Sequence, residues 1–196
     1  MAKADLIKRI AAVDPVHAET MSENPTEFQL NPLPFYRRFQ LLRATVDLPH
    51  KPIQVRYVDD GSRIIILQAT PDRIYEINRV EDLRLEHGQI SSYLHFFFEN
   101  SSGDPIHMVE SEGDVNWLDA SSQDPERKAL REKAITLIHP AKITPLLGNQ
   151  DYLVNATAIR GRNLTEISAR VRQNGHVDIL GERVLVPNAP VPEVGP

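Results

Sequence analysis

Cysteine is absent from the 196-residue chain. Its absence excludes disulfide bonds, thiolate catalysis, iron–sulfur clusters and zinc sites with thiolate ligands. No apolar run approaches the roughly 20 residues that a membrane-spanning helix needs. The N-terminus lacks an apolar segment followed by a cleavage site, so we expect no secretory signal. The sequence therefore predicts a cytoplasmic protein without a membrane partner.

The common nucleotide and hydrolase motifs are also missing. The chain contains no G-x-G-x-x-G, no phosphate-binding loop, no H-E-x-x-H and no G-x-S-x-G. Asp59-Asp60-Gly61 resembles part of a calcium loop but lacks the closing glutamate, so a hairpin turn is predicted there. We expect no metal and no cofactor. The net charge of −5 repels phosphate backbones and argues against nucleic acid as a partner.

The composition, 41% hydrophobic and 25% charged, is that of a folded globular protein. Three of the six phenylalanines are consecutive, at 96–98, within a stretch from Gln89 to Ser111. Its apolar spacing fits both a helix and a strand, and the preceding glycine and serines favour a helix over 89–97. A turn at 100–104 and a short strand at 105–110 should follow. Under either interpretation the three rings belong to the core.

The N-terminal third predicts a helix and an arm. Residues 2–13 have an amphipathic pattern, and 14–34 contain four prolines among polar residues, which is typical of an extended linker. We expect this helix to pack as a terminus on its own domain; docking on a protein partner is the alternative. Residues 35–46 have helical spacing, although 44–46 could already be extended. Arg37, Arg38 and Arg43 are expected on a solvated face, with an anion site as the alternative.

Residues 53–68 predict a hairpin. A two-residue loop at Asp60-Gly61 would pair Tyr57 with Ile64 and would place Val55, Tyr57 and Ile64 on one apolar face. The other face is also apolar, so both should be covered. Thr70-Pro71 then predicts the start of a helix.

The second half predicts a helix and an antiparallel meander. Asp124 should cap a helix that has Pro125 in its first turn. A loop at 161–162 pairs Ala158 with Thr165, and a loop at 173–175 pairs Val171 with Val177. A fourth strand is expected at 184–186. The Pro-rich residues 188–196 are expected to be disordered.

Together these elements predict an α+β fold made of antiparallel hairpins, a meander and packed helices in two small units. The expected organisation is a helix and arm over 1–34, an α+β unit over 35–120, a helix and meander over 121–187 and a tail over 188–196.

Candidate site residues are few. If residues 95–110 form a hairpin, His95 lies opposite Glu110, a minimal general-base pair, and His107 points to the other face. In a helix this pair disappears. Tyr93 and Trp117 are candidates to line a ligand pocket, although both suit a core. Arg160, Arg162, Arg170 and Arg172 form a basic cluster that opposing acids turn into a mixed-charge face.

The sequence thus favours a non-enzymatic protein that binds a protein partner or forms a homo-oligomer. The alternative is a small-molecule-binding protein or an enzyme, with a pocket under a curved sheet and a histidine as general base. A cleft lined by a histidine and a carboxylate would favour this alternative.

Overall fold

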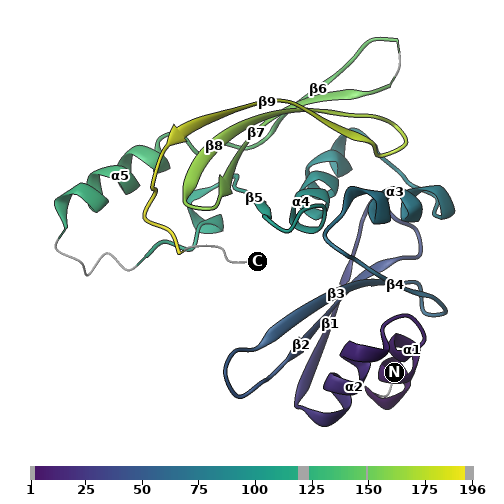
Figure 1. The fold of residues 1–196 in the computed structure, drawn as a ribbon. Coiled ribbons are helices and arrows are strands. Elements are labelled where there is room, and N and C mark those ends of the chain that lie inside the picture. The colour runs from purple at the N-terminus through teal and green to yellow at the C-terminus, as the bar shows by residue number, and fades with distance from the viewer. Residues whose placement is uncertain (1–2, 119–123, 149, 193–196) are drawn as a thin grey trace.

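The computed structural model describes residues 3–118, 124–148 and 150–192. Within these ranges the chain forms five α-helices and two antiparallel sheets, one of four strands and one of five. The predicted α+β class is confirmed. In Figure 1 the five-stranded sheet arches over helix α4 (Ile90–Asn100), and the four-stranded sheet lies on the far side of that helix.

The four-stranded sheet contains β1 (Thr26–Pro32), β2 (Gln40–Val46), β3 (Ile53–Asp59) and β4 (Ile64–Ile66) in sequence order. Helices α1 (Lys3–Ala11) and α2 (Pro15–Glu23) pack on its outer face (Figure 1). Leu6 and Ile10 of α1 are buried in a cluster with Leu42 and Tyr57 of the sheet. The predicted terminal helix is therefore confirmed, and it packs on its own chain.

The predicted arm over 14–34 is wrong, because these residues form α2 and β1. Asp14 caps α2, with its side chain accepting from the backbone N–H of His17 at 3.3 Å, and Pro15 occupies the first turn. The other Asp14 oxygen accepts the buried Tyr57 hydroxyl at 2.8 Å. Pro15 and Pro32 lie where a chain tolerates proline, in a first helical turn and at the end of edge strand β1.

The helix predicted over 35–46 is also wrong. Residues 35–39 form turns and bends, and β2 follows. The side chain of Glu81 is fully buried, and one of its oxygens accepts the backbone N–H groups of Arg37 and Arg38, each at 3.1 Å. The distant Glu81 carboxylate thus satisfies these two backbone N–H groups without a helix. The local spacing of apolar residues does not reveal such a partner.

The 53–68 hairpin is present, but its loop is longer than predicted. Tyr57 pairs with Ile66 rather than Ile64. The Asp60 side chain accepts the N–H groups of Ser62 and Arg63 and so stabilises the wider loop. A shift of two residues keeps every side chain on its predicted face, and both faces are covered as expected.

Helix α3 (Pro71–Val80), a 3-10 turn η1 (His87–Gln89) and α4 follow, and then strand β5 (Ile106–Met108). The helical interpretation of 89–97 is confirmed and the strand alternative is wrong. Phe96, Phe97 and Phe98 are 4%, 4% and 2% exposed. They are core residues, as predicted.

The five-stranded sheet joins β5 to β7 (Tyr152–Arg160), β8 (Asn163–Val171) and β9 (Val177–Val186), with β6 (Lys142–Pro145) also beside β7. The pairs predicted at both meander turns are confirmed. No separate strand covers 184–186, because these residues end β9, whose pairing with β8 is irregular near Leu180 and Leu185. Helix α5 (Pro125–Ile135), capped by Asp124 as predicted, packs beside Ile159, Leu164 and Val186 at one end of this sheet.

Part of the C-terminal segment is packed rather than disordered. Ala189 and Val191 are buried beside Ile159 and Val186, and Leu118 donates its N–H to the Pro190 carbonyl at 2.9 Å. Apolar residues between the prolines explain this packing. Residues 193–196 lie outside the described ranges.

A central cluster of buried side chains joins the two halves. It contains Leu41 and Val58 of the first sheet, the α4 phenylalanines and Ile167 of the second sheet. The boundary expected at 121 falls within 119–123, outside the described ranges, and the division into units stays a prediction.

Candidate functional site

A cleft of about 450 Å³ opens beside α4 and β5. His95 and Glu99 reach it from α4, and His107 reaches it from β5. The remaining walls are residues 108–109, 114–116, 159, 191 and 192. We call this the histidine cleft. Its volume is within the range of ligand-binding pockets.

His95 and His107 line the same cleft, although the hairpin interpretation of the sequence places them on opposite faces. In a hairpin they would point to opposite faces, but α4 is a helix and both line the same cleft. The predicted pair of His95 with Glu110 is not formed. Glu110 instead accepts the Ser91 hydroxyl at 2.8 Å and the backbone N–H of Ala141 at 3.4 Å, and it does not line the cleft.

Asp114 is the carboxylate that accompanies His95. It ends a 3-10 turn, η2 (Glu112–Asp114), and its Oδ2 accepts the N–H groups of Glu110 at 2.9 Å and Ser111 at 2.7 Å. The backbone N–H of Glu110 and then the Ser111 hydroxyl lower the pKa of Asp114, and nearby His95 lowers it further. Asp114 is therefore a fixed, ionised carboxylate beside an imidazole.

The floor of the cleft is apolar. Met108, Val109, Val115, Ile159 and Val191 each line it, and each is less than 9% exposed. His95, Glu99 and His107 are half-buried, whereas Asp114 and Asn116 are exposed. A ligand here would rest an apolar body on the floor and meet polar groups at the rim.

Tyr93 and Trp117 do not line this cleft. The Tyr93 hydroxyl donates to the Gly175 carbonyl and accepts from Asn78 Nδ2 at 2.8 Å, so it joins α4 to α3 and to the β8–β9 turn. Burial raises its pKa. Trp117 donates to the Glu112 carbonyl at 3.3 Å and has the Arg131 guanidinium 5.4 Å from its ring centre. Both contribute packing.

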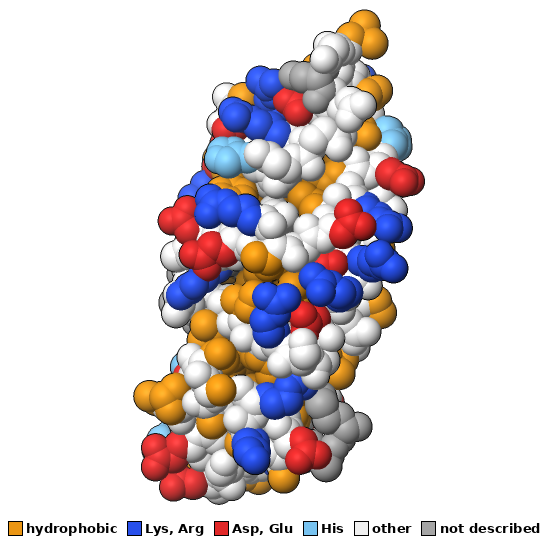
Figure 2. All heavy atoms as spheres, turned by 90° about the vertical axis from the view of Figure 1, so that its right-hand side faces the viewer, with side chains coloured by type: hydrophobic (Ala, Val, Ile, Leu, Met, Phe, Trp, Pro, Cys, Tyr) orange, Lys and Arg blue, Asp and Glu red, His pale blue; other side chains and the backbone are white. Residues whose placement is uncertain are grey.

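The predicted basic cluster on the meander is a mixed-charge surface. Arg170 pairs with Asp151 at 2.6 Å, and Arg172 pairs with Asp178 at 2.8 Å. Arg160 pairs with Glu182 at 2.7 Å. On the face in Figure 2, acidic and basic side chains are likewise interspersed.

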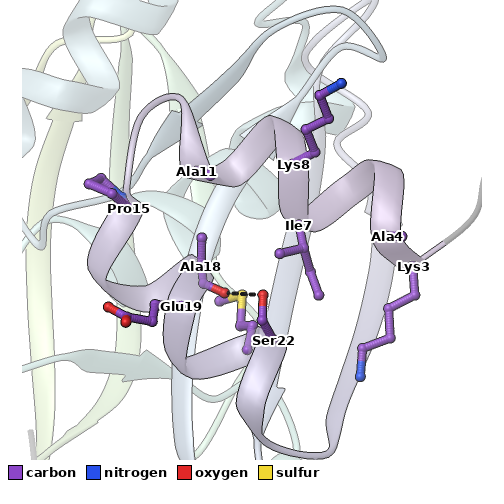
Figure 3. Close-up of a pocket in the computed structure, with 10 residues that line it drawn as sticks. Lys3, Ala4, Ile7, Lys8, Ala11, Pro15, Ala18, Glu19 and Ser22 are labelled. Carbon is purple, nitrogen blue, oxygen red and sulfur yellow. Dashed lines mark hydrogen bonds between the residues drawn. The ribbon is translucent and has the colours of Figure 1, made fainter.

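A second depression lies between α1 and α2, with a volume of about 740 Å³ (Figure 3). Ile7 and Ala18 face each other across it, while Lys3, Lys8 and Glu19 extend from its edges. No histidine is among the described residues that line it. It offers apolar contact but no side chain that titrates near neutral pH.

Among the described residues, no helix is long and apolar enough to cross a membrane. In the same ranges no group of three or more histidine, aspartate or glutamate side chains is arranged to hold a metal ion.

Comparison with known proteins gives no relative: no family model, no curated protein and no solved structure matches this chain.

Sequence reasoning missed Asp114 and Glu99. A signal for Asp114 was present, since Ser111-Glu112-Gly113-Asp114 has the serine-x-x-acid pattern of a capping box. Glu99 carried no such signal. Its place in the cleft depends on how α4 packs beside β5.

Proposed function

We propose that this protein binds a small molecule in the histidine cleft, where His95 accepts a proton from it. The observation that supports this proposal is that His95 and Asp114, a carboxylate whose pKa is lowered, line the same cleft above an apolar floor. A carboxylate stabilises the imidazolium that forms when a histidine takes up a proton. His107 supplies a second imidazole at the same rim.

The rim defines the kind of ligand. Two carboxylates and two imidazoles offer mainly hydrogen-bond acceptors at neutral pH. The ligand should therefore carry hydroxyl or amine hydrogens on an apolar body small enough for about 450 Å³. Proton abstraction by His95 is the reaction class that this arrangement favours.

The test is a ligand-observed NMR screen with small alcohols and amines that carry aliphatic or aromatic bodies. We expect a subset to bind the wild-type protein and to bind His95→Gln and His107→Gln at least tenfold more weakly. His50→Gln is the matched control, because His50 is exposed and lines none of the depressions described above. Fragments that bind all variants equally, or no binding at all, would contradict the proposal.

A second candidate function is self-association through β9, which preserves the protein-binding role favoured by the sequence. β9 is an edge strand, and Ile179, Leu180 and Val184 on it are 46%, 59% and 53% exposed. A second copy could pair with β9 about a two-fold axis, the commonest symmetry of homo-oligomers, and cover these side chains.

Native mass spectrometry tests the second candidate. We expect a dimer that Leu180→Glu converts to a monomer, while Val80→Glu, at a 48% exposed position of α3, leaves the dimer intact. A wild-type monomer at micromolar concentration would refute self-association. Deletion of α1 is unsuitable as a test, because Leu6 and Ile10 are core residues.

A further inference from the structure

Two arginines lie directly opposite each other in the four-stranded sheet. The β2–β3 register pairs Arg43 with Arg56. The neighbouring residues Leu42 and Ala44 pack toward α1 and α2, so by strand alternation the two arginines point to the other face, toward α4. Like charges at directly opposed positions destabilise a sheet.

Among the described residues, one carboxylate is paired with these two guanidinium groups. Arg43 lies 3.5 Å from the Glu99 carboxylate at the end of α4. Arg56 donates to the backbone carbonyl of Glu99 at 2.8 Å and to Gln54 Oε1 at 3.1 Å. Burial lowers the pKa of Arg56, Glu99 opposes this effect and Arg43 lowers the pKa further. The pair therefore carries excess positive charge in a partly desolvated place.

Arg56 lines a groove of about 770 Å³ between β3, β4 and the turn after α4. We call it the arginine groove. Lys51 adds a second cation to its lining, and Gln54, Asn100 and Ser102 add amide and hydroxyl groups. Glu99 is the single carboxylate among its described lining residues. The groove therefore has more cations than carboxylates, whereas the whole chain has a net charge of −5.

We propose that the arginine groove binds a small organic or inorganic anion whose carboxylate or phosphate group contacts Arg56 and Lys51, with Arg43 adding to the positive field. Guanidinium groups suit both anions, because their N–H donors match pairs of carboxylate or phosphate oxygens. A bound anion also offsets the repulsion between Arg43 and Arg56, because the single carboxylate of Glu99 balances one of their two positive charges. This inference does not rest on ligand binding in the histidine cleft, although Glu99 and His107 border both.

This inference can be tested by isothermal titration calorimetry and by thermal unfolding. The ligands are inorganic phosphate and citrate, and the control is sodium chloride of equal ionic strength. We expect at least one anion to bind saturably and to raise the melting temperature beyond the chloride control. A response to phosphate alone identifies a phosphate-type ligand, and a response to citrate alone identifies a carboxylate-type ligand. Arg56→Gln and Lys51→Gln should each weaken binding at least tenfold.

Arg183→Gln is the matched control, because Arg183 is an exposed arginine that pairs with Glu166 on the other sheet. Without added anion, Arg43→Gln should raise the melting temperature, because it removes the like-charge pair. If Arg56→Gln does not fold, Lys51→Gln still tests the site, because Lys51 is exposed and outside the core. No response of the wild type to either anion, or a response that Arg56→Gln and Lys51→Gln both leave unchanged, overturns the proposal.

Discussion

Gly175 is a residue where the two halves of the chain lie in close contact. Its φ of +79° lies in the left-handed region that glycine favours. A Cβ atom here would lie closer than 3.0 Å to side-chain atoms of Asn78, Leu83 and Tyr93. The Tyr93 hydroxyl donates to its carbonyl, and Asn78 Oδ1 accepts the Tyr36 hydroxyl in turn. One glycine thus closes a hydrogen-bond network across the molecule.

Gly175→Ala should therefore destabilise the protein by about 2 to 5 kcal/mol, from left-handed strain and overpacking together. Chemical denaturation measures the loss. Gly161→Ala is the control, since Gly161 also has a positive φ, +56°, but nothing lies within 4 Å of an added Cβ. It should cost only about 1 to 2 kcal/mol. Equal losses in the two variants would show that the close packing at Gly175 adds nothing.

At the scale of elements, predictions succeeded where local patterns and turns decide the structure. The β7–β8–β9 meander was predicted in register because the glycines at 161 and 175 fix the loops and the apolar alternation fixes the faces. The structure of residues 14–39 was predicted wrongly because it depends on partners far away in the sequence. The Tyr57 hydroxyl binds Asp14, and the Glu81 carboxylate accepts hydrogen bonds from the turn at 35–39. The histidine cleft depended on the same kind of long-range packing, which brought His95 and His107 together.

The contribution of helix α1 to stability is a test at this scale. Ile10 is 0% exposed and packs against the four-stranded sheet, so Ile10→Ala should destabilise the protein by about 2 to 5 kcal/mol. The free energy of unfolding measures this loss. Val16→Ala, at a 70% exposed position of α2, should change stability by less than about 0.5 kcal/mol. An Ile10→Ala variant as stable as the wild type would mean that α1 is not part of the core.

At the scale of the whole molecule, buried tyrosines set a limit on stability at high pH. Burial raises the pKa values of Tyr36, Tyr57 and Tyr93 above their ordinary value near 10. In Tyr57 the hydrogen bond to Asp14 adds to this effect. As pH rises, the unfolded chain loses these protons first. The stability from the neutral hydroxyls is therefore complete below about pH 10 and declines above it.

We expect the free energy of unfolding to be steady up to about pH 9 and to fall progressively as the pH rises above about 10. Denaturation curves at each pH, with tyrosinate absorbance as a second readout, measure the fall. Tyr57→Phe should make the fall shallower, whereas Tyr152→Phe, at a half-buried position on β7, is the matched control. Stability that stays constant through this range would contradict the role of the buried hydroxyls.

The shared central cluster also has a consequence for synthesis on the ribosome. The phenylalanines of α4 emerge long before Ile167 and Val177, which complete their surroundings. A nascent chain would expose that aromatic helix until the final hairpin leaves the exit tunnel, which makes it a natural binding site for a chaperone during translation.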